Sequence, residues 1–241
     1  MTQACVPEFP QLEQDVRQAL KDWHSNHTIT NPFPYLYLWR RVAHSGYQSA
    51  RQTTNQVLKD ALDALRETHE MAAQFIQMRF LDLLSIQQMA NKLNIAESTV
   101  YTLQREAIHW LADTLRQLER AASAEQKARL LRRLPAATYV NLIGVAARCE
   151  ELLQILAAPN PPWLIALEGI GGIGKTSLVH TVTNQAVERS LFDEVGWVSA
   201  QTTRFNLGGF ISPLEQPALR TEMLLEQLFQ QLLPEVPRAT L

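Results

Sequence analysis

The sequence predicts a multidomain protein, with an all-α N-terminal domain that contains a helix-turn-helix, followed by an incomplete α/β domain. Two observations predict this division. The first half repeats apolar residues at helical spacing and has no strand pattern, whereas the second half places short apolar runs on either side of a glycine-rich turn and a helix. The expected parts are a helical region at 1–66, the helix-turn-helix at 67–121, a basic linker at 122–136 and the α/β domain at 137–241.

Composition excludes several classes of protein. A chain of 241 residues with 46% hydrophobic and 19% charged residues can bury one or two cores and is not a disordered composition. Cys5 and Cys149 lie far apart without the spacing of a disulfide framework or a zinc site. No apolar stretch approaches the roughly 20 residues that a membrane span needs, and the N-terminus lacks a signal-peptide pattern. We therefore expect a cytoplasmic protein with no membrane segment.

Apolar residues at helical spacing predict the helices of the N-terminal region. One buried face begins at Leu12, a second at Val57 and a third at Ala72. Between the first two, NPFPYLYLWRRVAHSGYQ contains prolines and a glycine that interrupt a long helix, and its aromatic residues require burial. We interpret this segment as a connection that packs on the core, the alternative being a ligand cage of aromatic side chains. The expected buried faces are Leu12, Val16, Ala19, Leu20 and Trp23; Val57, Leu58, Ala61, Leu62 and Leu65; and Ala72, Phe75, Ile76, Phe80 and Leu83.

The stretch from Met78 to Leu115 has the layout of a helix-turn-helix. Ser85 and Gln88 form a capping box before a first helix, and a second helix begins near Glu97 after a turn at Asn94. The polar face of this second helix presents side chains that can reach base edges and phosphates in the major groove. The expected DNA-binding residues are Ser98, Thr99, Tyr101, Thr102 and Arg105.

Residues 67–118 resemble the DNA-binding region of bacterial sigma factors and related regulators, which implies duplex DNA as a partner and a role in transcription regulation. Ala96 stands where these families commonly have a capping serine or threonine, and Arg105 is the only base on the presumed face. A helical domain that keeps this shape but binds protein is the alternative. Additional bases follow in the linker and would either contact phosphates or be solvated: Lys127, Arg129, Arg132 and Arg133.

The second half predicts a strand, a helix and a second strand. A helix near 148–156 ends at PNPP, and the apolar run WLIALE after it suits a strand buried on both faces. A helix around Leu178 to Ala186 and the run VGWVSA follow. This order predicts a parallel sheet with right-handed crossovers.

The turn from Gly169 to Thr176, GIGGIGKT, matches the phosphate-binding pattern GxxxxGK[ST] between the predicted strand and helix. Glycines let successive backbone N–H groups point at phosphate oxygens. Lys175 should reach the β and γ phosphates, and the hydroxyl of Thr176 should ligate Mg²⁺. We expect magnesium-dependent binding of ATP or ADP; a glycine-rich turn that binds nothing is the alternative.

The string EGIGGIGKTSL, with NLIGVAARCEELLQIL before it and LFDEVGWVSAQ after it, resembles the N-terminal part of the NB-ARC domain of bacterial STAND-class P-loop NTPases, over about residues 138–241. The resemblance implies that Leu142 and Ile143 lie by the adenine. Gly144-Val145 stands where many relatives have Gly-Arg, so any role of that arginine is absent or displaced. The implied phosphate-binding residues are Gly169, Gly171, Gly172, Ile173, Gly174, Lys175, Thr176 and Ser177.

No apolar strand that ends in an aspartate follows Thr176, because Asp193 and Glu194 precede VGWVSA. In the NB-ARC family, which this segment resembles, that strand lies further along the chain. We therefore expect a fragment of a longer protein with little or no nucleotide hydrolysis. We predict a nucleotide-dependent signal-transduction regulator that binds DNA. The alternative is a defence or signalling adaptor whose helical N-terminus binds a protein effector or another copy of itself. A metabolic kinase would need a lid and acidic residues that this sequence does not show.

Overall fold

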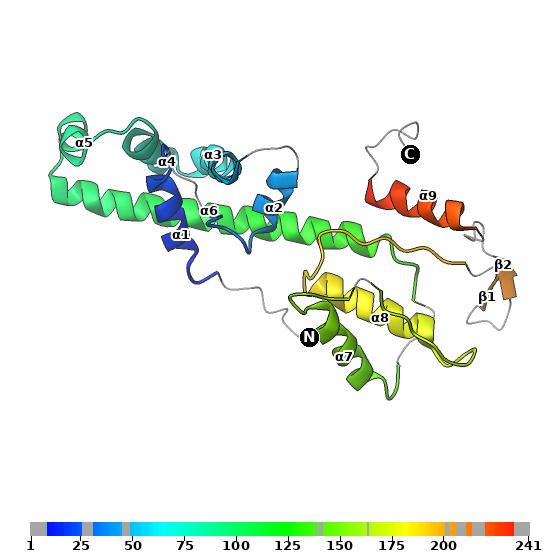
Figure 1. The fold of residues 1–241 in the computed structure, drawn as a ribbon. Helices are drawn as coiled ribbons and strands as arrows, with labels where there is room; N and C mark the ends of the chain where they lie inside the picture. The colour runs from blue at the N-terminus through cyan, green and yellow to red at the C-terminus, as the bar shows by residue number, and fades with distance from the viewer. Residues whose placement is uncertain are drawn as a thin grey trace. The chain divides into compact units, whose positions relative to one another are not determined.

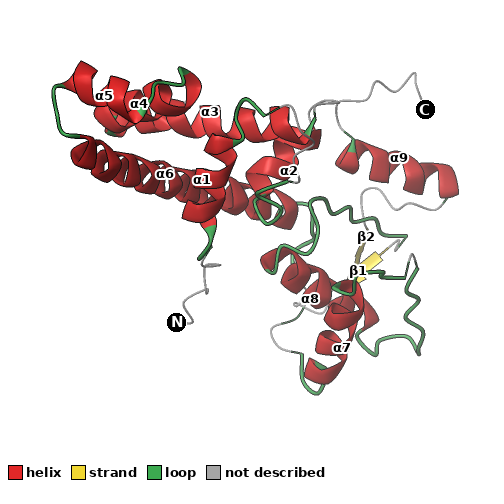
Figure 2. Cartoon of the chain, turned by 60° about the vertical axis from the view of Figure 1, so that its left-hand side comes forward, coloured by secondary structure: helices red, strands yellow, loops and turns green. Residues whose placement is uncertain are grey.

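The computed structural model describes residues 9–25, 31–44, 49–137, 139, 142–162, 164–200, 203–205, 211–213 and 220–233. The chain divides into two compact units, Met1–Ala124 and Glu125–Leu241. Figures 1 and 2 show the elements of both units. In chain order they are α1 (Leu12–Lys21), α2 (Tyr37–His44), α3 (Ala50–Thr68), α4 (Glu70–Ile76), the π-helical turn η1 (Gln77–Leu81), α5 (Ile86–Leu93), α6 (Glu97–Leu131), α7 (Ala146–Leu156), α8 (Lys175–Glu188), β1 (Thr203–Phe205), β2 (Ile211–Pro213) and α9 (Thr221–Leu232).

One hydrophobic core holds the first unit together, with buried residues from α1 through α6. The helices predicted from Leu12, Val57 and Ala72 are confirmed as α1, α3 and α4. Phe33 and Leu36 are fully buried, so the proline-containing connection packs on the core as predicted, and it also contains α2. The N-terminal helices and the helix-turn-helix segment thus share one core.

The prediction that Leu83 is buried is wrong. Its side chain is 64% exposed and its backbone φ is 58°, in the left-handed region. The helical pattern ends before it, because η1 closes with the N–H of Asp82 on the carbonyl of Gln77. The chain therefore turns at Leu83, and the side chain leaves the apolar face that Phe80 completes.

Helices α5 and α6 lie where the helix-turn-helix pattern predicts them. Ser85 and Gln88 form the capping box, with Gln88 N donating to Ser85 Oγ at 3.1 Å and Ser85 N donating to Gln88 Oε1 at 2.8 Å. Asn94 ends α5 in the left-handed conformation that such a turn requires. Residues 122–131, expected as linker, continue α6 without a break, because no glycine or proline interrupts the helical pattern there.

The second unit contains the predicted helices but not the predicted strands. Cys149 and Leu153 of α7 pack against Val182 and Ala186 of α8, so both predicted helices are confirmed. The strand predictions for WLIALE and VGWVSA are wrong for the described residues, since 164–168 and 195–200 belong to no strand. A strand needs a hydrogen-bonded neighbour, and no described segment pairs with either run.

The strands of the described residues are short and antiparallel. β1 pairs with β2, with Arg204 opposite Ser212. The parallel sheet expected from the sequence is therefore absent from this part of the chain. No helix among the described residues has both the length and the apolar character needed to cross a membrane.

Candidate phosphate-binding site

The glycine-rich turn at 169–174 is exposed and leads directly into α8. Gly172 and Gly174 have backbone φ values of 79° and 95°, which residues with a Cβ rarely adopt. Gly174 is the N-cap of α8, and its carbonyl accepts the N–H of Leu178 at 2.8 Å. A Cβ at either glycine would meet no atom within 4 Å, so conformation and not crowding requires glycine here.

Lys175 and Thr176 occupy the first turn of α8. Lys175 Nζ donates to the carbonyl oxygens of Gly169 at 2.7 Å and Ile170 at 2.9 Å, so the ammonium closes the turn. The hydroxyl-bearing Thr176 is exposed beside it. The N-terminus of a helix carries partial positive charge and free N–H groups, which favour a phosphate. The residues predicted for the loop, 169 and 171–177, thus lie together at the start of α8, and their binding of a nucleotide phosphate and Mg²⁺ stays a prediction.

A cavity of about 780 Å³ opens beside Lys175 and Thr176. This volume lies in the range of about 300–1,000 Å³ typical of small-molecule sites. Its walls are mainly apolar and come from α7, α8 and the two runs that the sequence predicts as strands. The other lining residues are Leu152, Leu156, Ile165, Leu167, Val179, Val182, Thr183, Trp197, Val198, Ser199 and Ala200.

The structure does not bring the two residues implied for adenine to this cavity. Leu142 lines a separate cavity of about 440 Å³, together with Tyr139, Cys149 and other residues of α7 and α8. Ile143 is 93% exposed. Their role beside the base stays a prediction.

His180, one turn after Thr176, is a feature that the sequence analysis missed. Its buried ring lies with Nε2 2.8 Å from the carbonyl oxygen of Pro135, which fixes Nε2–H as the donor in the neutral ring. Nδ1 then accepts from the hydroxyl of Tyr139 at 2.9 Å. The ring also meets that of Trp197 edge to face, with centroids 5.9 Å apart. His180 therefore ties α8 to two other segments, and no sequence pattern signals these contacts.

Helix α9, also not predicted, binds the backbone of Trp197. Trp197 N donates to Gln231 Oε1 at 2.8 Å, and Gln231 Nε2 donates to Trp197 O at 2.9 Å. The side-chain amide of Gln231 thus forms hydrogen bonds with both backbone groups of Trp197, as the backbone of a neighbouring strand would. A Cβ on Gly196 would lie 2.9 Å from Leu228 Cδ2, so α9 approaches closely because residue 196 is glycine.

Several bases of the predicted linker are engaged inside the second unit. Lys127 Nζ donates to the carbonyl of Glu188 at 2.6 Å. Arg129 and Arg133 both pair with the carboxylate of Glu194. These groups are already partnered, which weakens the expectation that they contact nucleic-acid phosphates.

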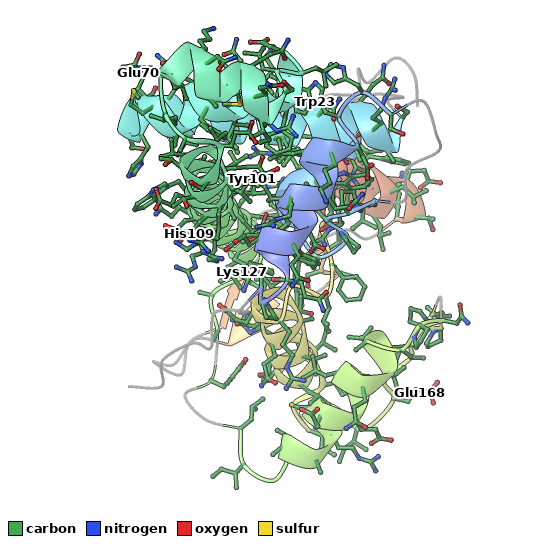
Figure 3. The ribbon with its side chains drawn as sticks, turned by 90° about the vertical axis from the view of Figure 1, so that its left-hand side faces the viewer. Trp23, Glu70, Tyr101, His109, Lys127 and Glu168 are labelled. Carbon is green, nitrogen blue, oxygen red and sulfur yellow. The ribbon has the colours of Figure 1, made fainter. Side chains whose placement is uncertain are left out.

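The five residues predicted to contact DNA are all exposed at the start of α6. They recur at helical spacing on one face, and Figure 3 labels Tyr101 there. The hydroxyl of Thr102 donates to the carbonyl of Ser98 at 3.3 Å. The face formed by Ser98, Thr99, Tyr101, Thr102 and Arg105 is thus accessible within its own unit.

Comparison with known proteins finds one family match. Residues 145–208 match the family model of the NB-ARC domain. Disease resistance proteins of Arabidopsis thaliana are similar to this chain. RPP8 is 30% identical over 83 residues, covering 33% of this chain and 9% of RPP8, and an RPP8-like protein is 36% identical over 66 residues, covering 27% and 7%. A further disease resistance protein is 26% identical over 126 residues, covering 49% and 14%.

These alignments span between 7% and 14% of the relatives' own length. No solved structure matches the chain. The comparisons support an NB-ARC P-loop NTPase domain that includes residues 145–208.

Proposed function

We propose that this protein is a nucleotide-dependent signalling switch of the STAND type, whose second unit binds ATP or ADP with Mg²⁺ and whose first unit binds a protein partner. The observation that carries the proposal is the position of Lys175 and Thr176, in the first turn of α8, after a glycine turn and at the edge of a cavity. The similarity to disease resistance proteins supports the adaptor interpretation of the helical unit.

Nucleotide binding would change the hydrogen bonds of the loop. The Lys175 ammonium, which donates to the carbonyls of Gly169 and Ile170, would donate to β- and γ-phosphate oxygens, while loop N–H groups and the α8 N-terminus hold the same phosphates. The hydroxyl of Thr176 would ligate Mg²⁺. Because His180 follows on the same helix and touches Trp197, a shift at the start of α8 would reach the segment that α9 binds.

Calorimetric titration of the whole chain with Mg²⁺–ADP and Mg²⁺–ATP tests the proposal. Replacing Lys175 by alanine should weaken binding by about tenfold or more, since a charge-assisted hydrogen bond contributes about 1.5–3 kcal/mol. Lys92→Ala is the matched control, because it removes the same charge from an exposed position on α5. Equal affinity of Lys175→Ala and Lys92→Ala would refute the nucleotide site.

DNA binding by the first unit is the second candidate. It is favoured by the capping box of α5, the left-handed Asn94 and the exposed polar face at the start of α6. A recognition helix placed after such a turn can enter a major groove. In this version, the nucleotide state of the second unit would control access to duplex DNA.

A further inference from the structure

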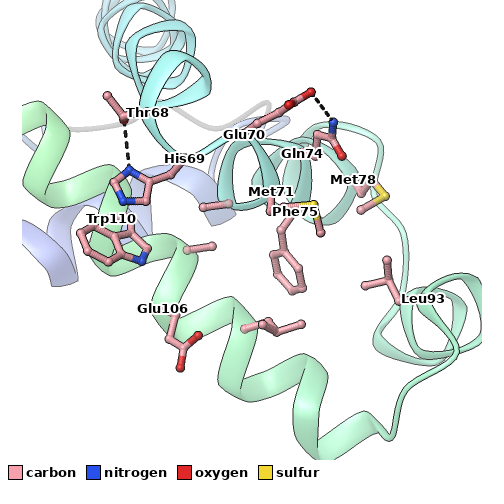
Figure 4. Close-up of a pocket in the computed structure, with 13 residues that line it drawn as sticks. Thr68, His69, Glu70, Met71, Gln74, Phe75, Met78, Leu93, Glu106 and Trp110 are labelled. Carbon is pink, nitrogen blue, oxygen red and sulfur yellow. Dashed lines mark hydrogen bonds between the residues drawn. The ribbon is translucent and has the colours of Figure 1, made fainter.

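A groove on the first unit runs between two helical faces. Its walls come from α4 with η1 and from α6, and Leu93 at the end of α5 lies at one end (Figure 4). Its volume is about 480 Å³. The lining residues recur at helical spacing on both walls, Glu70, Met71, Ala72, Gln74, Phe75 and Met78 on one side and Leu103, Glu106, Ala107 and Trp110 on the other, with Thr68 and His69 beside them.

Large apolar side chains remain exposed at this groove. Met71 is 76% exposed and Trp110 is 40% exposed, whereas Phe75 at the floor is buried. The ring of His69 stacks on that of Trp110, with centroids 4.1 Å apart and an angle of 22° between the ring planes. This contact holds the indole in place at the mouth. Exposed tryptophan and methionine are frequent anchors of protein interfaces, and methionine adapts its shape to a partner.

The charge at the rim has one sign. Glu70 and Glu106 stand on opposite walls and are exposed, and the described residues that line the groove include no lysine or arginine. Glu70 Oε1 accepts a hydrogen bond from Gln74 Nε2 at 3.0 Å, which orients the carboxylate along its own helix. A partner that brings positive charge to both walls would therefore be favoured over an acidic one.

We propose that this groove binds a basic amphipathic helix of a partner protein. The wall residues 70–78 and 103–110 each span about two helical turns, roughly 11–12 Å, which matches a helix that presents apolar residues at i, i+4 and i+7. Its apolar side chains would fill the groove between Phe75 and Trp110. Lysine or arginine residues beside them would meet Glu70 and Glu106. This inference rests on the proposed protein-binding role of the first unit and names the chemistry of its partner.

Fluorescence anisotropy with two synthetic peptides tests the proposal on the full chain. Both peptides carry leucines at i, i+4 and i+7; one has lysines at the flanking positions and the other has glutamates. The wild-type protein should bind the lysine peptide at least tenfold more tightly. The double variant Glu70→Lys with Glu106→Lys should reverse this preference, because it changes the sign of both rim charges.

The control double variant is Asp60→Lys with Glu97→Lys, which makes the same change in net charge at exposed positions outside the groove. It should keep the wild-type preference. If the two double variants discriminate between the peptides equally, general charge and not the groove governs binding, and the proposal is overturned.

A second pair of variants tests the apolar contact without adding charge. Met71→Gln should weaken binding of the lysine peptide by at least fivefold, whereas Leu83→Gln, at an exposed leucine outside the groove, should not. If both variants bind the lysine peptide equally well, the groove is excluded as its binding site. Titration of the same proteins with Mg²⁺–ADP keeps the two proposals apart, since a wild-type protein that binds nucleotide but neither peptide contradicts the groove alone.

Discussion

Glu119 of α6 caps the start of α2 through Leu38, whose backbone N–H donates to Glu119 Oε2 at 3.0 Å. The neighbouring Oε1 accepts from the N–H of Tyr37 at 2.9 Å and from the hydroxyl of Ser123 at 2.8 Å. The first N–H groups of a helix have no partner inside it, so this carboxylate supplies one from far along the chain. Glu119 is only 3% exposed, and its three contacts replace the water that it loses.

Replacing Glu119 by alanine should destabilise the first unit by about 3 kcal/mol. The substitution leaves the N–H groups of Tyr37 and Leu38 without their acceptor, and each buried unsatisfied donor costs about 1–3 kcal/mol. Chemical denaturation followed by circular dichroism measures the loss. Glu125→Ala, at an exposed position of the same helix, is the control and should change stability by less than about 0.5 kcal/mol. Equal midpoints would show that water satisfies the start of α2.

Gly174→Ala should destabilise the second unit, whereas Gly171→Ala should not. Gly174 has a φ of 95°, and a residue with a Cβ pays about 1–2 kcal/mol in the left-handed region. Gly171 is not among the glycines with positive φ, and a Cβ there would meet no atom within 4 Å. Thermal unfolding of the two variants without nucleotide measures the difference. A matching loss in both would mean that the turn is not held in this conformation.

Gln231→Ala should loosen α9. It removes the acceptor and the donor that hold Trp197, a loss of about 1–3 kcal/mol for two hydrogen bonds. Hydrogen exchange in α9 and at Trp197 should then accelerate by about tenfold. Gln230→Ala is the matched control, because Gln230 pairs with Glu226 on its own helix. Unchanged exchange in Gln231→Ala would show that Leu228 and its apolar neighbours hold α9 without the amide.

Local patterns predicted the helices well and the sheet poorly. The faces of α1, α3, α7 and α8 follow from apolar spacing, and the capping box at Ser85 follows from two residues three apart. A strand instead depends on a partner elsewhere in the chain, which a local run such as WLIALE does not specify. The same limit applies to α9, whose contact with Trp197 joins residues 34 positions apart.

The candidate site, like the fold, could be predicted from the sequence only in part. The phosphate loop is contiguous, so its residues could be named from the pattern alone, and the structure places Lys175 and Thr176 at one cavity. Leu142 and Ile143 rest on a resemblance, and the structure places Leu142 at a separate cavity and leaves Ile143 exposed. His180 was missed because its importance comes from Pro135, Tyr139 and Trp197, which no spacing rule connects to it.

If the first unit binds duplex DNA, the variant Arg105→Ala with Thr102→Ala should weaken binding. It should also make the plot of the logarithm of the binding constant against the logarithm of the salt concentration less steep, by about one unit of slope. The control is Arg120→Ala with Thr114→Ala on the same helix, where the hydroxyl of Thr114 bonds the carbonyl of Trp110 as that of Thr102 bonds Ser98. Electrophoretic mobility shifts at several salt concentrations provide the comparison. If the protein does not bind DNA even at low salt, protein binding remains as the candidate function of the first unit.

The whole chain should bind nucleotide but turn it over very slowly. Among the described residues that line the cavity, Lys175, Thr176, Thr183 and Ser199 are polar or positively charged, and none of those described is an aspartate or glutamate. Loop N–H groups and Lys175 hold the phosphates in the ground state and the transition state alike, and such uniform binding does not accelerate the chemical step. Hydrolysis also requires a group that orients the attacking water, for which a carboxylate or an amide side chain is usual. Phosphate release by the wild type should therefore equal that of Lys175→Ala, even at ATP concentrations that saturate the wild type. A rate well above that of the variant would show that an acidic residue outside this lining reaches the γ-phosphate, and Glu168, next to the loop, would be the first to replace by glutamine.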